Sequence, residues 1–220
     1  MRRVGKHCAI SYISDLNDLY WLQSTRRITP LHSVYVLNAA ALTKRNAVQL
    51  LTADLQNYNI DVAFISETHF KAKHSDSVIA VPGYTVYRRD RVGCKGGGVA
   101  IYVRSTLQSN IWTYATDNST YELLWVQVNT VIAGALYHPP RPLYDSLSLI
   151  DYIEGCTDEI TRKFLQNLIV LAGDFNKLST NSIEERRLLA SYHLSVNLQE
   201  AQVFSIKSLF HSRNTRKFKF

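Results

Sequence analysis

The sequence predicts a mixed α/β protein built from several layers. Short apolar runs rich in β-branched and aromatic residues recur along the chain, as in 33–37 and 168–172. Between them lie segments with apolar residues at helical spacing, and short turns such as Asn129-Thr130 join some of the runs. A sheet whose strands are apolar on both sides must be covered on both faces. The protein therefore needs several layers of secondary structure to bury these strands.

The first half of the chain alternates strands with one long helix. Strands are predicted at residues 33–37, 61–66, 84–87 and 99–103. Residues 43–58 form an amphipathic helix, because Ala47, Leu50, Leu51, Asp54 and Leu55 recur at helical spacing, and Thr43 is a candidate N-cap. Pro82-Gly83 marks a turn, and residues 88–98 read as a loop. The Gly96–Gly98 run lacks the Lys-Ser/Thr of a phosphate-binding loop, so we interpret it as a turn that leads into a strand.

The second half continues the same pattern. Strands are predicted at residues 107–114, 121–128, 131–137, 168–172 and 203–209, and helices at 144–166 and 183–192. Pro139-Pro140 ends the strand before it, and Trp112 and Trp125 are expected in the core. No internal repeat or linker divides the chain. Residues 1–31 lack a clear period and are expected to form a poorly ordered or accessory leader, so one domain is predicted over 32–220.

Composition excludes several classes of protein. Of 220 residues, 46% are hydrophobic and 20% charged, which excludes a disordered or low-complexity chain. No apolar run approaches the roughly 18 residues of a membrane-spanning helix, and the basic start has no apolar stretch typical of a secretory signal. Cys8, Cys94 and Cys156 are too few and too widely spaced for a disulfide framework or a zinc site, so an intracellular location without membrane contact is expected.

The net charge of +7 lies at the two ends of the chain. Residues 1–31 carry +3 and residues 201–220 carry +5, whereas residues 32–200 carry −1. A basic protein can bind a polyanion, but solvated basic termini explain the same numbers equally well. Charge therefore does not decide between a nucleic-acid-binding protein and other classes.

Four predicted strands stop on a polar residue, and these strand ends are the main functional signal. The strands end at Asn38, Glu67, Tyr137 and Asp174, with Asn176 two residues beyond the last one. Each residue alone has an ordinary explanation: a carboxylate can be the first solvated residue after a strand, a tyrosine before Pro-Pro can be packing, and asparagine often forms turns. The joint pattern is more specific, because ligand sites of layered α/β proteins gather at strand ends.

The chemistry of this set suits a hard cation and a phosphate. Two carboxylates and two carboxamides offer oxygen ligands, and Mg²⁺ is commonly held by one or two carboxylates with water and substrate oxygens. The phenol and the carboxamide nitrogens can donate hydrogen bonds to phosphate oxygens.

Five segments of the sequence resemble conserved motifs of the endonuclease/exonuclease/phosphatase superfamily. The similar segments are "LNAAAL" (37–42), "DVAFISETHF" (61–70), "PGYTVYRRDR…GGGVAIYVR" (82–104), "GALYHPP" (134–140) and "LAGDFN" (171–176). They are most similar to the endonuclease domain of LINE-type, non-LTR retrotransposons, over roughly residues 32–216. The resemblance implies a four-layered α/β sandwich of two sheets flanked by helices. It also implies Mg²⁺-dependent (or Mn²⁺-dependent) hydrolysis of a phosphodiester in double-stranded DNA, and a nuclear location.

The resemblance also implies roles for the strand-end residues. Glu67 corresponds to the metal-ligand glutamate and Asn38 to the asparagine beside it. Tyr137 corresponds to the tyrosine that contacts the scissile phosphate. Asp174 corresponds to the aspartate that orients or deprotonates the attacking water, and Asn176 to the asparagine that holds the phosphate and that aspartate.

Two departures from the family pattern lead us to expect weak or absent activity. The family ends with a Leu-Asp strand and a Ser-Asp-His motif, whereas this sequence stops at "NTRKFKF" and contains no Ser-Asp-His. His211 lacks that context, and the arginine of the family's first motif is replaced by Ala40. Loss of one member of a cooperating catalytic set can remove most of the rate. The absent strands would also leave an open edge on the second sheet.

Residues beside the motifs have two interpretations. Arg88, Arg89, Arg91 and Lys95 are candidates for contacts with a DNA backbone, or are the charges of a solvated loop. His69 and His138 adjoin Glu67 and Tyr137, but strand neighbours face opposite sides, so neither is expected to bind the metal.

Three hypotheses follow from the sequence. The first is a retrotransposon-type, metal-dependent nuclease. The second is an inactive chain that at most binds nucleic acid weakly through its basic ends. The third is a phosphatase-like enzyme for a phosphoinositide or sphingolipid headgroup, against which the "RRDR…GGGVAIYVR" stretch argues.

Overall fold

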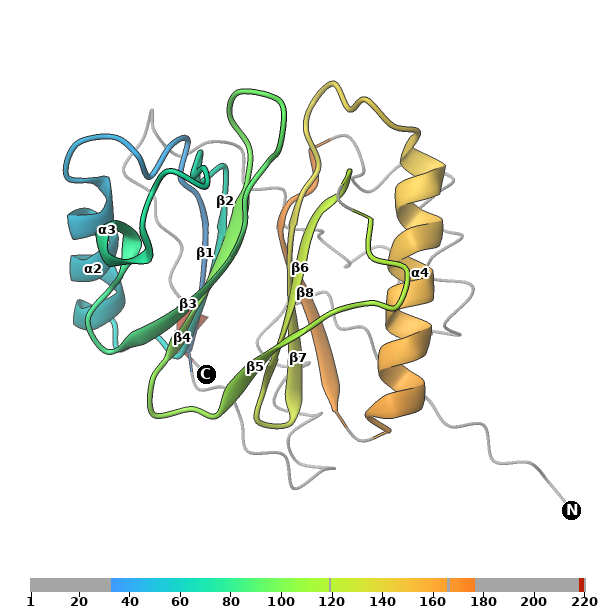
Figure 1. Ribbon diagram of the computed structural model, residues 1–220. Coiled ribbons are helices and arrows are strands. Elements are labelled where there is room, and N and C mark those ends of the chain that lie inside the picture. The colour runs from blue at the N-terminus through green and yellow to red at the C-terminus, as the bar shows by residue number, and fades with distance from the viewer. Residues whose placement is uncertain (1–32, 119, 166, 177–217, 220) are drawn as a thin grey trace, which may run out of the picture.

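Two β-sheets lie face to face in the computed structural model, with helices on their outer faces (Figure 1). The structure describes residues 33–118, 120–165, 167–176 and 218–219. The leader predicted for 1–31, the helix predicted at 183–192 and the strand predicted at 203–209 lie outside these residues. Within them, the predicted four-layered α/β sandwich is confirmed, in the order helix, sheet, sheet, helix.

The first sheet has the strand order β3-β4-β2-β1-β9. Its strands are β1 (Ser33–Asn38), β2 (Val62–Ser66), β3 (Tyr84–Arg89), β4 (Val99–Arg104) and the short β9 (Phe218–Lys219). β1 and β2 are parallel, and Asn38 pairs with Ser66 in their register. The two strands therefore end side by side, which places Asn38 next to Glu67.

The second sheet has the strand order β5-β6-β7-β8. Its strands are β5 (Ser109–Trp112), β6 (Glu122–Val128), β7 (Val131–Tyr137) and β8 (Leu168–Asp174). β7 and β8 are parallel with Tyr137 opposite Asp174, so this sheet also brings two polar strand ends together. Among the described residues, β8 is the last strand on this side of the second sheet.

The helices cover the outer faces of the two sheets. α2 (Ala47–Asn57) and α3 (Asp76–Ile79) lie on the first sheet, where α2 buries Leu51 and Leu55. α4 (Ser146–Lys163) covers the second sheet (Figure 1). The Asp145 carboxylate caps α4 by accepting a 3.1 Å hydrogen bond from the main-chain N–H of Ser148.

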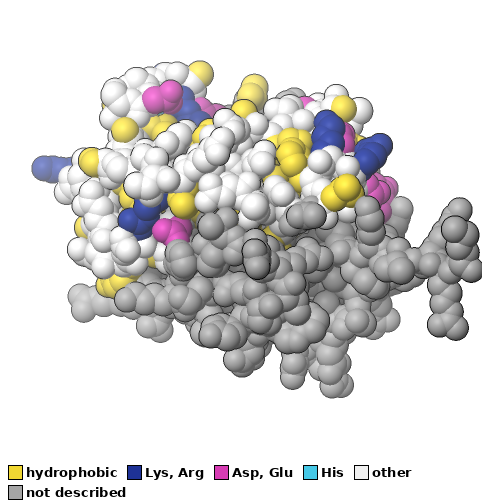
Figure 2. Space-filling view, turned by 90° about the horizontal axis from the view of Figure 1, so that it is seen from below, with side chains coloured by type: hydrophobic (Ala, Val, Ile, Leu, Met, Phe, Trp, Pro, Cys, Tyr) yellow, Lys and Arg dark blue, Asp and Glu magenta, His cyan; other side chains and the backbone are white. Residues whose placement is uncertain are grey.

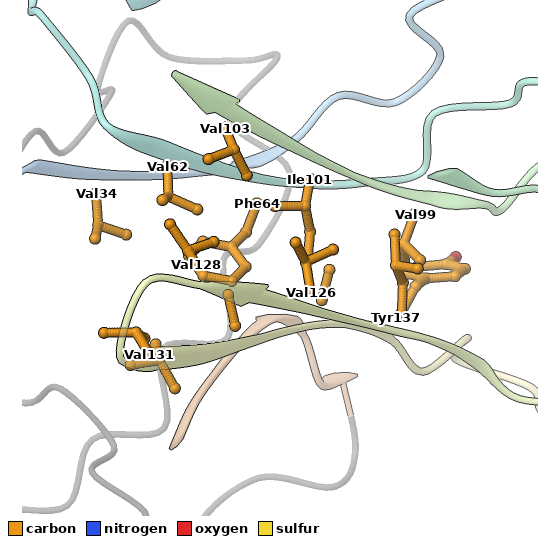
Figure 3. Close-up of a cluster of buried hydrophobic side chains, with 14 residues drawn as sticks. Val34, Val62, Phe64, Val99, Ile101, Val103, Val126, Val128, Val131 and Tyr137 are labelled. Atoms are coloured by element: carbon orange, nitrogen blue, oxygen red, sulfur yellow. The ribbon is translucent and has the colours of Figure 1, made fainter. Parts of the chain in front are cut away.

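An apolar core joins the inner faces of the two sheets. Phe64 and Ile101 from the first sheet meet Val126 from the second, and all three are 0% exposed (Figure 3). Burial of a side chain of this size stabilises the fold by about 1.5–3 kcal/mol. Because this core fixes how the sheets face each other, it also sets how their strand ends meet.

Several predicted boundaries differ from the structure, and three of the differences have a clear physical reason. The helix predicted from Thr43 begins at Ala47, because residues 41–46 form turns and Asn46 adopts a left-handed conformation as the N-cap residue. The predicted loop at 88–98 begins later, since Arg88 and Arg89 still pair with β4. The strand predicted over 107–114 is limited to β5 because Leu107 forms a turn with Arg104.

The charged side chains of the described residues form no large basic surface on the face that Figure 2 shows. Basic side chains there lie singly or beside acidic ones. This agrees with the near-neutral charge of residues 32–200. No helix in the described part of the chain combines the length and the apolar character needed to cross a membrane.

Candidate active site

The polar ends of four strands meet at one edge of the sandwich. β1 and β2 contribute from the first sheet and β7 and β8 from the second, and β2 contacts both β7 and β8. The Asn38 amide nitrogen donates to Glu67 Oε1 at 3.1 Å and to Asp174 Oδ2 at 2.7 Å. The Asn38 amide oxygen accepts from the main-chain N–H of Ala40 at 3.0 Å, which fixes the orientation of the amide. One carboxamide thus links carboxylates from both sheets.

Tyr137 and Asn176 complete the set that the sequence predicted. The Tyr137 hydroxyl is hydrogen-bonded to the Glu67 carboxylate, and its side chain is almost fully buried. The main-chain N–H of Asn176 donates to Asp174 Oδ1 at 3.1 Å, and the Asn176 amide nitrogen donates to the His138 carbonyl oxygen at 2.6 Å. Asn176 therefore orients Asp174 and ties β8 to the segment after β7. All five predicted residues lie in one site.

Burial controls the protonation of the two most enclosed groups. Burial raises the pKa of Asp174, and the negative charge of Glu67 adds to this, although hydrogen bonds from Asn38 and Asn176 oppose it. Burial and the Glu67 carboxylate also raise the pKa of Tyr137 well above its usual range. Tyr137 is thus a neutral hydrogen-bond donor at neutral pH, and Asp174 is a carboxylate with increased basicity.

The backbone around the site is strained. Eight non-glycine residues of the described chain have positive φ, and five of them lie here: Ala40, Ala41, Glu67, His69 and Asn176. Alanine and glutamate seldom adopt this conformation, which costs on the order of 1–3 kcal/mol for each residue. Hydrogen bonds from Ala41 N–H to the Glu67 carbonyl oxygen (2.9 Å) and from His69 N–H to the Gly97 carbonyl oxygen (2.7 Å) hold the turn. Such strain is typical of functional sites.

The two neighbouring histidines differ in position. His138 is buried away from the carboxylates, with Nδ1 3.1 Å from the Tyr144 hydroxyl, and burial lowers its pKa to about 4. His69 Nε2 instead lies 3.8 Å from Glu67 Oε2. The expectation that His69 faces away from Glu67 is therefore wrong, because the two residues are two positions apart rather than adjacent, and they lie in a turn of positive φ beyond the end of β2. Burial lowers the pKa of His69, and nearby Lys44, Lys71 and Arg91 act in the same direction, whereas Glu67 opposes them.

Arg88 and Arg89 of β3 have partners outside the strand-end cluster. Arg88 donates to the His74 carbonyl oxygen at 2.9 Å and lies 3.5 Å from Asp76. Arg89 forms a two-pronged pair with Asp117, at 2.8 and 3.3 Å. Lys95 is exposed.

Arg91 is the loop arginine that lies at the site. Its guanidinium carbon is 5.3 Å from the centre of the Tyr137 ring. Arg91 is paired with Glu122, a residue that the sequence analysis did not single out. Glu122 begins β6 opposite Tyr137, and its only sequence signal is a charged residue at the start of an apolar strand.

A four-layered α/β sandwich with carboxylates, carboxamides and a phenol at adjoining strand ends has the architecture of nucleases and phosphatases. The chain belongs to the Endonuclease/Exonuclease/phosphatase family, which matches residues 15–205. No curated protein sequence matches the chain.

Solved structures show the same fold at low sequence identity. An AP endonuclease from Archaeoglobus fulgidus is 16% identical, with a TM-score of 0.52 over 73% of this chain and 69% of that one. The endonuclease domain of TRAS1, a telomere-specific non-LTR retrotransposon, is 17% identical, with a TM-score of 0.52 over 74% of this chain and 73% of that one. The catalytic domain of Xenopus laevis APE2 is 14% identical, with a TM-score of 0.50 over 66% and 58%.

Proposed function

We propose that the protein is a Mg²⁺-dependent phosphodiester hydrolase that nicks double-stranded DNA. The observation that carries the proposal is the Asn38 amide, which joins Glu67 of one sheet to Asp174 of the other. It places a partly exposed carboxylate beside a buried, more basic one, next to a neutral phenol. Similarity to an AP endonuclease and to a retrotransposon endonuclease domain supports DNA as the substrate.

The residues present fit a divalent cation. The described residues hold no cluster of three His, Cys, Asp or Glu side chains suited to a metal. Mg²⁺ does not need one, because it binds through one or two carboxylates and keeps water and substrate oxygens. Glu67, whose side chain is 24% exposed, and the Asn38 amide would hold the ion, with Asp174 adjacent. A bound Mg²⁺ or Mn²⁺ would stabilise negative charge on the phosphate.

The chain's own residues supply the remaining chemistry. Asp174 orients or deprotonates the attacking water, and the Asn176 N–H and the Asn38 amide keep its two oxygens in fixed directions. Burial keeps the Tyr137 hydroxyl neutral. When the substrate binds, this hydroxyl donates its hydrogen bond to the phosphate instead of to the Glu67 carboxylate. On this proposal the protein works on chromosomal DNA in the nucleus.

A plasmid-nicking assay tests the proposal. The wild-type chain at high concentration should convert supercoiled plasmid to open circles with Mg²⁺ and should stop when the metal is chelated. Glu67→Gln and Asp174→Asn should each reduce nicking at least 100-fold, by loss of a metal ligand and of the base. Asp158→Asn, on the exposed side of α4, is the matched control and should nick normally. Nicking that survives both site variants would overturn the proposal.

A second candidate is a DNA-binding protein without turnover. The observations that favour it are Ala40 at the place of the arginine in the family's first motif, and the His138 ring buried against Tyr144. Fluorescence anisotropy with labelled duplex DNA separates the two functions. The second candidate predicts binding with no nicking, and weaker binding when the basic residues 201–220 are removed.

A further inference from the structure

Arg91, one of four candidate contacts with a DNA backbone, is the one that lies at the site. It belongs to the loop between β3 and β4, and its guanidinium stacks over the Tyr137 ring at 5.3 Å. Its side chain is 21% exposed, so it is neither free in solvent nor part of the core. A cation at this distance over an aromatic face interacts favourably with the ring. Tyr137 therefore has a carboxylate, Glu67, at its hydroxyl and a positive charge above its face.

Glu122 fixes the position of Arg91. Arg91 Nε donates to Glu122 Oε1 at 2.6 Å, and a second guanidinium nitrogen contacts the same oxygen. The other oxygen, Oε2, accepts from the main-chain N–H of Gly98. The Glu122 side chain is 8% exposed, and in the register of β6 and β7 it lies opposite Tyr137. The carboxylate is thus buried, satisfied on both oxygens, and anchored to the strand that neighbours the Tyr137 strand.

The glycine run closes over this ion pair. Gly97 has φ of +65°, and a Cβ there would collide with Arg91 Nε and Glu122 Oε2. Gly98 has φ of +86°, and its main-chain N–H donates a hydrogen bond to the Glu122 carboxylate. The run therefore has a specific structural purpose: it brings the backbone close enough to enclose the pair, which no other residue type allows at Gly97.

The pair leaves one part of the guanidinium available. Nε and one terminal nitrogen contact Glu122, whereas the other terminal nitrogen, Nη1, donates only a long, 3.4 Å hydrogen bond at the surface, to the Lys95 carbonyl oxygen. In contrast, Arg89 uses both terminal nitrogens on Asp117 and on the Asn118 carbonyl oxygen. A fixed guanidinium with a free edge is well suited to a phosphate oxygen.

We propose that Arg91 binds the phosphodiester beside Tyr137 and that Glu122 is the residue that positions it. This rests on the proposed function and adds to it a cationic contact for the substrate. A guanidinium held in place before the substrate arrives stabilises negative charge on the phosphate without reorganising. The Arg91–Glu122 pair would then serve the reaction as well as closing a loop.

A nuclear magnetic resonance experiment tests the proposal without requiring activity. The side-chain Nε–H signal of Arg91 is assigned by its loss in Arg91→Lys, and it should be protected from exchange because Glu122 accepts it. Dimethyl phosphate, a minimal phosphodiester, should shift this signal, and Glu122→Gln should broaden or remove it. No shift at saturating dimethyl phosphate would overturn the proposal, whether or not the protein nicks DNA.

A matched control separates phosphate binding from structural support. Arg104, at the opposite end of the first sheet, donates from Nε to Asp61 at 3.1 Å and lies 5.9 Å from the Tyr84 ring centre. Arg104→Gln therefore removes the same kind of pair far from the site. Arg91→Gln should lower kcat/KM for nicking roughly 100-fold, and Arg104→Gln less than about threefold. Guanidinium ions should partly rescue Arg91→Ala but not Asp174→Asn.

The outcomes separate the two proposals. If the wild type nicks DNA and Arg91→Gln nicks equally well, the role of Arg91 is overturned while the proposed function stands. If the wild type does not nick but dimethyl phosphate shifts the Arg91 signal, the proposed hydrolysis fails while phosphate binding by Arg91 stands.

Discussion

Asp174 shows at the scale of one residue how burial and hydrogen bonding set reactivity. Burial and the Glu67 charge raise its pKa, while the Asn38 amide and the Asn176 N–H stabilise the charged form. In metal-free protein, the carboxyl carbon of Asp174 should therefore titrate above the usual value of about 3.9. Nuclear magnetic resonance can follow this carbon, assigned with Asp174→Asn.

The same titration tests the proposed metal site. Mg²⁺ favours the ionised carboxylate, so its addition should move the Asp174 titration to lower pH. Asn38→Ser should move it to higher pH, because it removes a hydrogen bond to the charged form. A midpoint at or below pH 3.9 in metal-free protein would contradict the prediction.

His138 gives a prediction about stability. Its ring is buried and its pKa is lowered to about 4, whereas in the unfolded chain it is near 6.5. Between these values the unfolded state binds the proton and the folded state does not, so stability is lost as pH falls from 6.5 to 4. The loss should be roughly 3 kcal/mol. Urea unfolding across this range should show a shallower pH dependence for His138→Gln, and an equal slope in both proteins would refute the role of His138.

At the scale of secondary structure, the sequence predicted the elements that carry the site. The strand at 131–137 matches β7 residue for residue, because Asn129-Thr130 and Pro139-Pro140 bound a continuous apolar run. Asn38 and Tyr137 could be identified because a polar residue that ends such a run is a local signal. The start of α2 was mispredicted because tertiary hydrogen bonds, such as Leu42 N–H to the Thr68 carbonyl oxygen, hold residues 41–46 in turns.

The Arg91–Glu122 pair marks the limit of what local pattern can predict. The two residues are separated by 31 positions, with Arg91 in the loop between β3 and β4 of the first sheet and Glu122 at the start of β6 in the second. No periodicity or turn links them, and only the packing of the sandwich brings them together. The left-handed turn at Glu67–His69 is similar, because hydrogen bonds from neighbouring segments impose it against local preference.

Gly173 gives a prediction for the strand that positions Asp174, the proposed base. It precedes Asp174 on β8 with φ of +145°, and a Cβ would collide with the Leu136 carbonyl oxygen of β7. Gly173→Ala should therefore cost about 1–3 kcal/mol in urea unfolding and displace Asp174, with a large loss of nicking. Gly83→Ala is the control, since it has φ of +83° but nothing within 4 Å. Equal losses of stability and nicking in both variants would show that the close approach of β7 and β8 does not matter.

At the scale of the whole molecule, the site depends on how the two sheets face each other. Ile101 lies in the core between the sheets and Ile132 in the core under α4, and both are fully buried strand residues. Ile101→Val and Ile132→Val should each cost about 0.5–1.5 kcal/mol of unfolding free energy. Only Ile101→Val loosens the contact between the sheets that holds Asn38 and Glu67 against Asp174. Small displacements of reacting groups lower the reaction rate strongly. We therefore expect a several-fold loss of nicking for Ile101→Val and less than about twofold for Ile132→Val. Equal rates at equal stability would mean that the strand-end hydrogen bonds, rather than the inter-sheet core, hold the two halves of the site together.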